Sequence, residues 1–387
     1  MLPYLLPLLL LLFSESHAFV PLKKGTTTRP SFAAQDDFGG KPPSKGDLYS
    51  QEDLQAIFDL HNNLQEFRDR YRPAKSVEDI PNIQDLVQQF LQESTIEKDE
   101  ETTKLQNIRA IASDVDGTLL TTNHTMHPRT TAALVQILQQ VQDPLSPLQF
   151  FFLATGKTRP GAWHHMPPEL QSLLQTCPGV YIQGLYCVNS EQQVVFEQTL
   201  SAESVQAAEL FAAQHQLTLL GYQADQLYAT ESSHPYHVQE IHSKYGEPEP
   251  ILVPSFEGRT WHKLILMGSD NEMLQRVYRP LWDNLAERHG ATTTQAVPLM
   301  LELLPAGCNK GVGVERLCHE LGIDPQTELL AVGDGENDKE MLEMAALGIA
   351  LGNAVSVTKS VADVVLTETN NEGAAGMALE RYVLQQR

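Results

Sequence analysis

The chain has 387 residues and a formal net charge of −22 at pH 7, with 49 acidic and 27 basic side chains. A surface this acidic repels the phosphates of DNA and RNA, which argues against a nucleic-acid-binding protein. The 4 cysteines include no CxxC pair, which argues against a zinc site and against a disulfide scaffold.

The first 45 residues have the composition of a targeting leader. Residues 1–18 hold an apolar run with the length of a signal-peptide core, too short for a stable membrane anchor. Residues 19–45 are basic and hydroxyl-rich, with no acid before Asp36, as in a transit peptide. With Phe19 at the junction, this resembles the bipartite leader of plastid proteins in diatoms and related algae. A plastid location is predicted, with secretion or the endomembrane lumen as the alternative.

Residues 46–105 carry apolar side chains at helical spacing, interrupted near Pro73 and Pro81. This pattern predicts a helical amino-terminal extension of two amphipathic helices joined by a turn. Such an extension can pack on the rest of the chain, mediate oligomerisation or bind a partner, and its sequence does not choose among these roles.

The first of four chemical motifs is the sequence DVDGTL, which begins at Asp114 and follows the apolar run 108–112. Residues i and i+2 of an extended segment point the same way, so Asp114 and Asp116 can reach one reacting centre. The carboxyl edge of an open α/β sheet is also where ligands bind. One acid can then attack while the other moves protons.

The other three motifs follow in order along the chain. Thr155 and Gly156 end the apolar run 150–154, and a hydroxyl with a backbone N–H suits a phosphate oxygen. Lys310 lies in a glycine-containing loop before a helical pattern. The acidic loop 333–338 follows another apolar run, and its carboxylates suit Mg²⁺.

Together these motifs resemble the haloacid dehalogenase superfamily, and specifically its Cof-type hydrolases of subclass IIB. The subfamily resemblance rests on the loop 333–338 followed by Met341, and on the stretches 348–354 and 362–367. The likeness covers roughly residues 106–387. It implies an α/β fold, with a Rossmann-like doubly wound parallel sheet and an inserted α+β cap. The alternation of apolar strands and helices independently favours a parallel sheet covered on both faces.

The resemblance implies a core made of residues 106–182 and 301–387, with a large C2-type cap inserted over residues 183–300. The cap would close over the core, exclude water and select the substrate. The helices and strands expected in the insert cover residues 202–215, 217–222, 226–229, 261–267 and 271–288.

The family chemistry assigns roles to the acids. Asp114 would be the nucleophile and form an aspartyl-phosphate. Asp116 would protonate the leaving alkoxide and then activate water. Mg²⁺ would be held by the carboxylates of Asp114 and Asp334 and by the backbone carbonyl of Asp116. The acid at Asp116 favours phosphate chemistry over dehalogenation, because an ester leaving group needs a proton.

The remaining roles concern the phosphoryl group. Lys310 and Thr155 would hold its oxygens and offset their charge, with Gly156 beside them. Asn337 would face the phosphate, while Asp338 would orient Lys310 or a metal-bound water. For Lys157, which stands where many relatives carry arginine, a solvated side chain and a ligand contact remain open.

These roles imply a Mg²⁺-dependent phosphatase for a small phosphorylated metabolite, such as a sugar phosphate or a nucleotide-like cofactor. A phosphomutase that uses the same aspartyl-phosphate, or a catalytically idle binding protein of this fold, is the alternative. In the cap the sequence is least informative: Gln183 stands where relatives commonly have asparagine, and aromatic residues such as Tyr222 are expected mainly to pack. Histidines without a clear metal-ligand spacing are expected at the surface or facing substrate: His164, His165, His234, His237 and His242.

Overall fold

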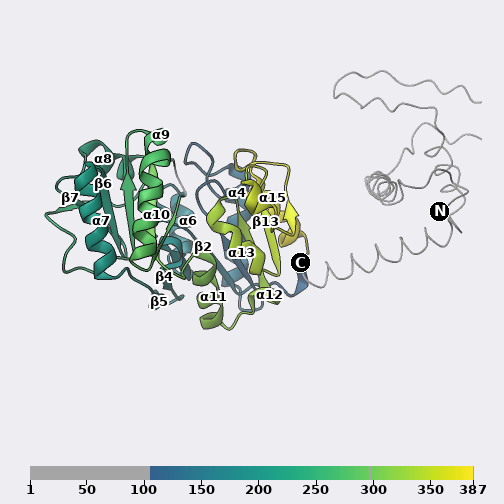
Figure 1. Ribbon diagram of the computed structural model, residues 1–387. Coiled ribbons are helices and arrows are strands. Elements are labelled where there is room, and N and C mark those ends of the chain that lie inside the picture. Colours follow the sequence, from purple (N-terminus) through teal and green to yellow (C-terminus); the bar gives the residue numbers. More distant parts are fainter. Residues whose placement is uncertain (1–104, 296–297, 387) are drawn as a thin grey trace, which may run out of the picture. The chain divides into compact units, whose positions relative to one another are not determined.

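The protein is represented by a computed structural model that describes residues 105–295 and 298–386 (Figure 1). The predicted signal peptide, transit peptide and nearly all of the helical extension lie outside the described residues. Among the residues that are described, no helix combines the length and the apolar character needed to cross a membrane.

The larger of two sheets has eight strands in the order β14-β13-β12-β1-β2-β3-β4-β5. The strands from β14 to β3 are parallel, and β4 and β5 extend the sheet in antiparallel fashion. Their bounds are β1 (Ala110–Ser113), β2 (Phe150–Ala154), β3 (Gly179–Tyr181), β4 (Tyr186–Val188), β5 (Val194–Glu197), β12 (Leu329–Gly333), β13 (Leu347–Ala350) and β14 (Val364–Val365).

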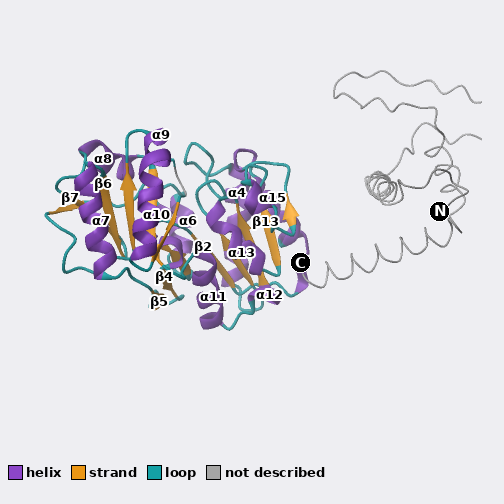
Figure 2. Cartoon of the chain, in the orientation of Figure 1, coloured by secondary structure: helices purple, strands orange, loops and turns teal. Residues whose placement is uncertain are grey.

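Helices cover both faces of this sheet (Figure 2). Ile111 and Phe151 point to the face covered by α4, α6 and α15, whereas Ala110 and Ala112 point to the face covered by α11 and α13. Strands buried on both faces need continuous apolar runs, as this sequence has. The helices are α4 (Pro128–Gln142), α5 (Arg159–Trp163), α6 (Pro168–Leu174), α11 (Lys310–Leu321), α12 (Pro325–Glu328), α13 (Lys339–Met344), α14 (Ser356–Lys359) and α15 (Ala374–Tyr382).

The smaller sheet has six strands in the order β10-β11-β9-β6-β7-β8. We call the larger sheet with its helices the core, and the smaller sheet with its helices the cap. The cap strands are β6 (Thr218–Gln223), β7 (Gln226–Thr230), β8 (Ile251–Val253), β9 (Lys263–Met267), β10 (Ala291–Thr294) and β11 (Met300–Pro305). Its helices are α7 (Ala202–His215), α8 (Pro235–Ser243), α9 (Asn271–Met273) and α10 (Arg279–Arg288), with the π-helical turn Leu274–Tyr278 between the last two.

The two faces of the cap sheet have different partners. In β9, Leu264 and Leu266 join the cluster that α7 and α10 cover, whereas Ile265 joins the cluster shared with the core. Side chains alternate along a strand, so Lys263 shares the face of Ile265. One face of the cap sheet is therefore the interior of the cap, and the other is turned toward the core.

The predicted Rossmann-like, doubly wound core with an inserted α+β cap is confirmed by this architecture. The insert differs at both ends from the expected range of 183–300. Strands β4 and β5 pair within the core sheet, and β11 pairs within the cap sheet. The chain leaves the core sheet after Glu197 and leaves the cap sheet after Pro305. The sequence did not indicate these boundaries, because a strand-like run such as 301–304 looks the same in sequence whichever sheet it joins.

Candidate active site

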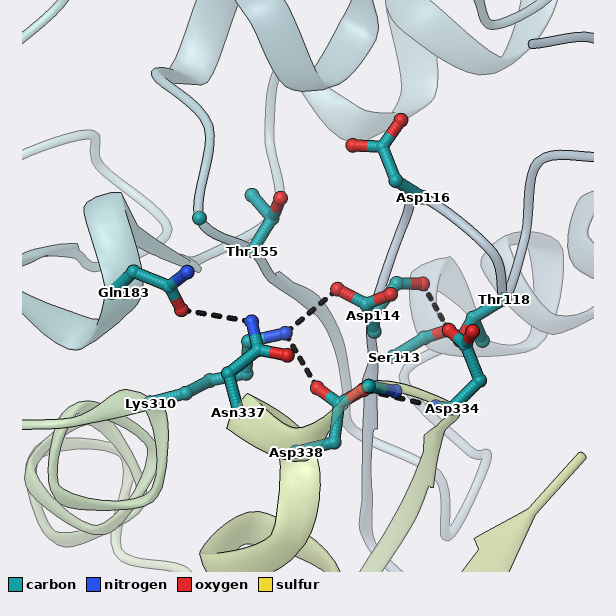
Figure 3. A network of polar contacts seen from close by, with 12 residues as sticks. Ser113, Asp114, Asp116, Thr118, Thr155, Gln183, Lys310, Asp334, Asn337 and Asp338 are labelled. Carbon is teal, nitrogen blue, oxygen red and sulfur yellow. Dashed lines mark hydrogen bonds and ion pairs between the residues drawn. The ribbon is translucent and has the colours of Figure 1, made fainter. Parts of the chain in front are cut away.

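Three of the four sequence motifs lie at the carboxyl ends of neighbouring parallel strands. Asp114 follows β1, Thr155 follows β2 and Asp334 follows β12, and β1 lies between the other two strands. The carboxyl ends of parallel strands meet at one edge of the sheet, which brings these side chains to a common site. Lys310, the first residue of α11, reaches the same site from the side (Figure 3).

The ammonium group of Lys310 lies between two carboxylates. Its Nζ is 2.7 Å from Oδ1 of Asp114 and 2.5 Å from Oδ1 of Asp338, and all three residues are buried. The other oxygen of Asp338 accepts the backbone N–H groups of Asp334 at 2.9 Å and Gly335 at 2.8 Å. Asp338 therefore fixes both the lysine and the start of the acidic loop.

Asp334 is held by two neutral donors. The Thr118 hydroxyl donates to its Oδ1 at 2.8 Å, and the Asn353 amide donates to its Oδ2 at 3.0 Å. Asn353 also donates to the carbonyl of Gly117 at 2.9 Å, which ties the acidic loop to the first motif. Both donors are neutral, so these two hydrogen bonds bring no positive charge to the carboxylate.

The acidic residues fit a hard divalent cation. Among the described residues, Asp114, Asp334 and Asp338 have carboxylate oxygens within 4.8 Å of one another. Asp338 accepts hydrogen bonds from Lys310 and from two backbone N–H groups, whereas Asp334 accepts only from two neutral side chains and Asp114 only from Lys310, so Asp114 and Asp334 are the better ligands. Buried carboxylates that outnumber the one ammonium group suit Mg²⁺, which binds oxygen ligands.

The pKa shifts report the same excess of negative charge. Burial and the charge of Asp338 raise the pKa of Asp114 well above its usual range, although Lys310 acts in the opposite direction. Burial, assisted by Asp338, raises the pKa of Asp334 to about 7. Burial would lower the pKa of Lys310, but the charges of Asp114 and Asp338 outweigh it and raise that pKa.

These shifts predict how the effect of Mg²⁺ on stability would depend on pH if the cation binds these acids. An acid whose pKa is raised in the folded state stabilises the fold at low pH, and this contribution is lost as pH rises through the raised pKa, about 7 for Asp334. Mg²⁺ binds the ionised carboxylates, so it should raise the melting temperature more at about pH 8 than at about pH 5. Thermal melts with EDTA and with Mg²⁺ at both pH values measure this, and equal Mg²⁺ effects would contradict it.

Gly117 is required where the first motif meets the acidic loop. Its φ is +85°, and a Cβ there would lie 2.4 Å from Oδ2 of Asp334. We expect Gly117→Ala to displace Asp334 and to raise the Mg²⁺ concentration needed for half-maximal activity by roughly tenfold or more. Gly322→Ala is the matched control, because Gly322 has a φ of +68° with no atom within 4 Å of the added Cβ. Equal Mg²⁺ requirements in the two variants would refute the expectation.

Asp116 lies apart from the other acids. Its Oδ1 is 2.8 Å from Nζ of Lys157 and 3.7 Å from Nδ1 of His124, and its side chain points away from Asp114 (Figure 3). Burial would raise the pKa of Asp116, but the hydrogen bonds and charges of His124 and Lys157 outweigh it and lower that pKa. Lys157 is buried in this ion pair, so the interpretation as a solvated lysine is wrong.

A cavity of about 460 Å³ opens above these residues, with its floor on the core and its roof on the cap. Tyr222, an aromatic cap residue that was expected mainly to pack, lines this cavity. The floor includes Asp114, Asp116, Thr155, Gly156, Lys157 and Asn337. The roof includes Tyr222, Ile241, Lys263, Ile265, Met300 and Glu302.

Sequence reasoning missed Lys263 and Glu302, two buried polar residues of the roof that connect it to the floor. Lys263 Nζ lies 3.0 Å from Oε1 of Glu302 and donates to the carbonyl of Gly156 at 2.7 Å. Gln183 donates to Oε2 of Glu302 at 3.0 Å and accepts from the Asn337 amide at 2.9 Å. The available signal was a lysine and a glutamate inside the apolar runs KLILM and MLELLP.

Glu247 is a second missed group at this boundary. The Thr158 hydroxyl donates to its carboxylate at 2.5 Å, and the Tyr222 hydroxyl donates at 3.3 Å. Burial raises the pKa of Glu247 to about 7 despite the hydrogen bonds from Thr158. A core loop and the cap are thus joined here as well.

Among the described residues, no histidine belongs to a group of three or more potential metal ligands that lie within 4.8 Å of one another. His237 is buried, which makes the expected surface or substrate-facing position wrong for this residue. Its ring nitrogens lie 2.8 Å from the Thr218 hydroxyl and 3.2 Å from the Ser269 hydroxyl, so it links parts of the cap.

Comparison with known sequences identifies the family of this chain. A profile for haloacid dehalogenase-like hydrolases matches residues 111–378. A chloroplastic protein of Arabidopsis thaliana, named endoribonuclease YBEY, is 34% identical over 70% of this chain but only 46% of its own length. An uncharacterized hydrolase of Schizosaccharomyces pombe is 27% identical over 72% of this chain and 92% of its own. A phosphoglycolate phosphatase of Methanopyrus kandleri is 48% identical over 17% of this chain and 28% of its own.

Solved structures share the architecture. A haloacid dehalogenase-like hydrolase from Bacteroides thetaiotaomicron has a TM-score of 0.58 and 25% identity, and the match covers 71% of this chain and 99% of that one. A subclass IIB sugar phosphatase has a TM-score of 0.58 and 20% identity, over 71% of this chain and 98% of that one. The second likeness concerns the fold alone.

Proposed function

This chain belongs to the haloacid dehalogenase-like hydrolases and to their Cof type, and from this premise we propose that it is a Mg²⁺-dependent phosphatase. The substrate is a small phosphorylated metabolite, and the reaction proceeds through an aspartyl-phosphate. The observation that carries the proposal is the buried carboxylate of Asp114, held 2.7 Å from Lys310 on the floor of the cavity with Asp334 beside it.

The acids divide the chemistry into two steps. In the first, an oxygen of Asp114 forms a bond to phosphorus while the bond from phosphorus to the ester oxygen breaks. Asp116 gives a proton to the leaving oxygen, which departs as an alcohol. In the second step water attacks the phosphorus of the aspartyl-phosphate, the bond from phosphorus to Asp114 breaks and inorganic phosphate is released. Asp116 takes a proton from that water and is then the acid for the next first step. The ionised Asp116 beside Lys157 is the form that the second step needs.

The other residues bind the transferring group. Lys310, Thr155 and Asn337 lie around the floor of the cavity, where an ammonium, a hydroxyl and an amide suit phosphoryl oxygens. Asp114, Asp334 and the backbone carbonyl of Asp116 would hold Mg²⁺. When bound, Mg²⁺ offsets the negative charge of the acids and of the phosphoryl group.

Three further points support a small phosphate ester as the substrate. Asp116 provides the acid that an alkoxide leaving group requires, and the chain is locally similar to a phosphoglycolate phosphatase. The cavity of about 460 Å³ also lies within the usual size range of small-molecule sites. These points favour a metabolite over a macromolecular substrate.

Phosphate release from p-nitrophenyl phosphate and a panel of phosphorylated metabolites tests the proposal. Activity should disappear with EDTA and return with Mg²⁺, because without the cation the acids repel the phosphoryl group. Addition of a bisphosphorylated sugar separates a phosphomutase, which isomerises its substrate, from a phosphatase, which releases inorganic phosphate. Purified protein that hydrolyses no compound of the panel would contradict the proposal.

We also propose that the chain acts in a plastid. The composition of residues 1–45 supports this, and so does the chloroplastic location in the name of the Arabidopsis relative. Fluorescent protein fused behind residues 1–45 should enter the plastid of a diatom cell, whereas fluorescence outside the plastid would contradict the proposal.

Residues 46–105 are proposed to mediate oligomerisation or partner binding, since their apolar residues recur at helical spacing. Light scattering of the full chain and of a variant without residues 46–104 tests self-association. If both proteins have the mass of one chain, self-association is excluded and partner binding remains. In that case the full chain, but not the shortened variant, should capture a second protein.

A further inference from the structure

We propose that Gln183 is a positioning residue that makes the phosphate site depend on the cap. Its carboxamide joins Glu302 of the cap to Asn337 of the acidic loop, so the cap in place over the core fixes Asn337 for catalysis. The inference rests on the proposed phosphatase function and adds a residue to it.

The backbone around Gln183 is strained. Ile182, Gln183 and Gly184 have successive φ values of 52°, 60° and 89°, a left-handed turn that is unfavourable for the first two residues and most of all for a β-branched isoleucine. Such strain persists only where the surroundings enforce it, and it concentrates at functional sites. A relaxed turn would direct the Gln183 side chain elsewhere.

The surroundings that enforce this turn belong to the phosphate-binding floor. The Gln183 N–H donates to the carbonyl of Thr155 at 3.0 Å, and the Ile182 N–H donates to the carbonyl of Lys157 at 2.9 Å. On its other side, a Cβ added to Gly184 would lie 2.2 Å from the carbonyl oxygen of Asn309, next to Lys310. The turn is therefore fitted between two of the loops that hold the phosphoryl group.

The side chains form one continuous relay between core and cap. It begins at the carbonyl of Gly156, which accepts from Lys263, and Lys263 pairs with Glu302. Glu302 accepts from Gln183, and Gln183 accepts from Asn337. Both ends of the relay lie on core loops of the phosphate site, while its centre lies on cap strands β9 and β11.

The carboxamide of Gln183 satisfies both of its neighbours. It donates to a carboxylate through its nitrogen and accepts from an amide through its oxygen. The side chains of Gln183, Lys263 and Glu302 are almost fully buried, so solvent does not replace a lost partner. Without Glu302 above it, Gln183 no longer restrains Asn337, and without Lys263 the Gly156 carbonyl loses its donor. The phosphate site is thus complete only when the cap covers it and water is excluded.

Exchange of the carboxamide and the carboxylate between residues 183 and 302 tests the relay. Gln183→Glu replaces the donor by a second carboxylate facing Glu302, and it should lower kcat by roughly 10- to 100-fold at about pH 8. The double variant Gln183→Glu with Glu302→Gln re-forms the hydrogen bond between the two residues with its direction reversed, and each residue can still accept from its other neighbour, Asn337 or Lys263. We expect it to recover kcat to within about threefold of the parent, since the hydrogen-bond pattern is re-formed. The Mg²⁺ concentration for half-maximal activity should stay the same in all variants.

Binding of inorganic phosphate with Mg²⁺, measured by calorimetry, is a second readout that needs no turnover. It should weaken in Gln183→Glu and recover in the double variant. Gln139→Glu, the same change on the exposed surface of α4, is the control and should match the parent in both readouts. Thermal melts verify that each variant is folded.

The relay is overturned if folded Gln183→Glu keeps kcat and phosphate affinity within about twofold of the parent. It is equally overturned if the double variant is no better than the single one. A parent protein that releases no phosphate refutes the proposed phosphatase instead, and phosphate binding then decides the relay by itself.

Discussion

Asp114→Asn is expected to lower the rate of phosphate release by roughly 10,000-fold or more. The amide keeps the shape of the side chain but has no oxygen able to attack phosphorus. The stability of the protein should stay equal or rise, because burial and the charge of Asp338 make an ionised Asp114 costly in the folded state. Initial rates and thermal melts measure the two effects.

The control for this variant is Asp283→Asn, which makes the same change on the exposed surface of α10 and should leave the rate unchanged. If Asp114→Asn loses its activity because it no longer folds, the result indicates a structural role for Asp114. Activity of a folded Asp114→Asn protein within about tenfold of the parent would exclude Asp114 as the nucleophile.

Lys310→Met is expected to damage both activity and stability. The rate should fall by roughly 1,000-fold or more, since the phosphoryl group loses a buried cation. The free energy of unfolding should fall by about 3–5 kcal/mol, because buried carboxylates then face each other without their common partner. The destabilisation should be larger at about pH 8 than at about pH 5, where carboxyls with raised pKa values take up protons.

Denaturant unfolding at the two pH values, with initial rates beside it, tests this expectation. Lys244→Met is the matched control, because the side chain of Lys244 is 53% exposed and its ion pair with Glu240 is on the surface. A folded Lys310→Met protein with unchanged stability and activity would show that the ammonium group has neither role.

The residues of the cavity floor could be predicted from the sequence, because their positions depend on where strands end and helices begin. Asp114 and Asp334 each follow an apolar run, and parallel strands bring such ends to one edge. Asp338 and Lys310 begin helices next to that edge, so their proximity to Asp114 also follows from the motif order. The catalytic roles of these residues stay predictions that the variants test.

The roof of the cavity requires information that the sequence does not contain locally. Lys263 and Glu302 meet because β9 and β11 are antiparallel neighbours, and the strand order of the cap sheet decides this. The ion pair between Asp116 and Lys157 likewise joins residues from two loops. The left-handed turn at Gln183 arises from tertiary hydrogen bonds to the loop of Thr155, against the backbone preference of Ile182.

The transient attachment of the phosphoryl group to Asp114 is tested most directly by rapid acid quench during turnover, followed by peptide mapping with mass spectrometry. We predict one phosphoryl group on the peptide that contains Asp114, absent from Asp114→Asn and absent when Mg²⁺ is removed before substrate is added. A phosphoryl group on any other residue, or steady turnover in which no phosphorylated peptide forms, would contradict this mechanism.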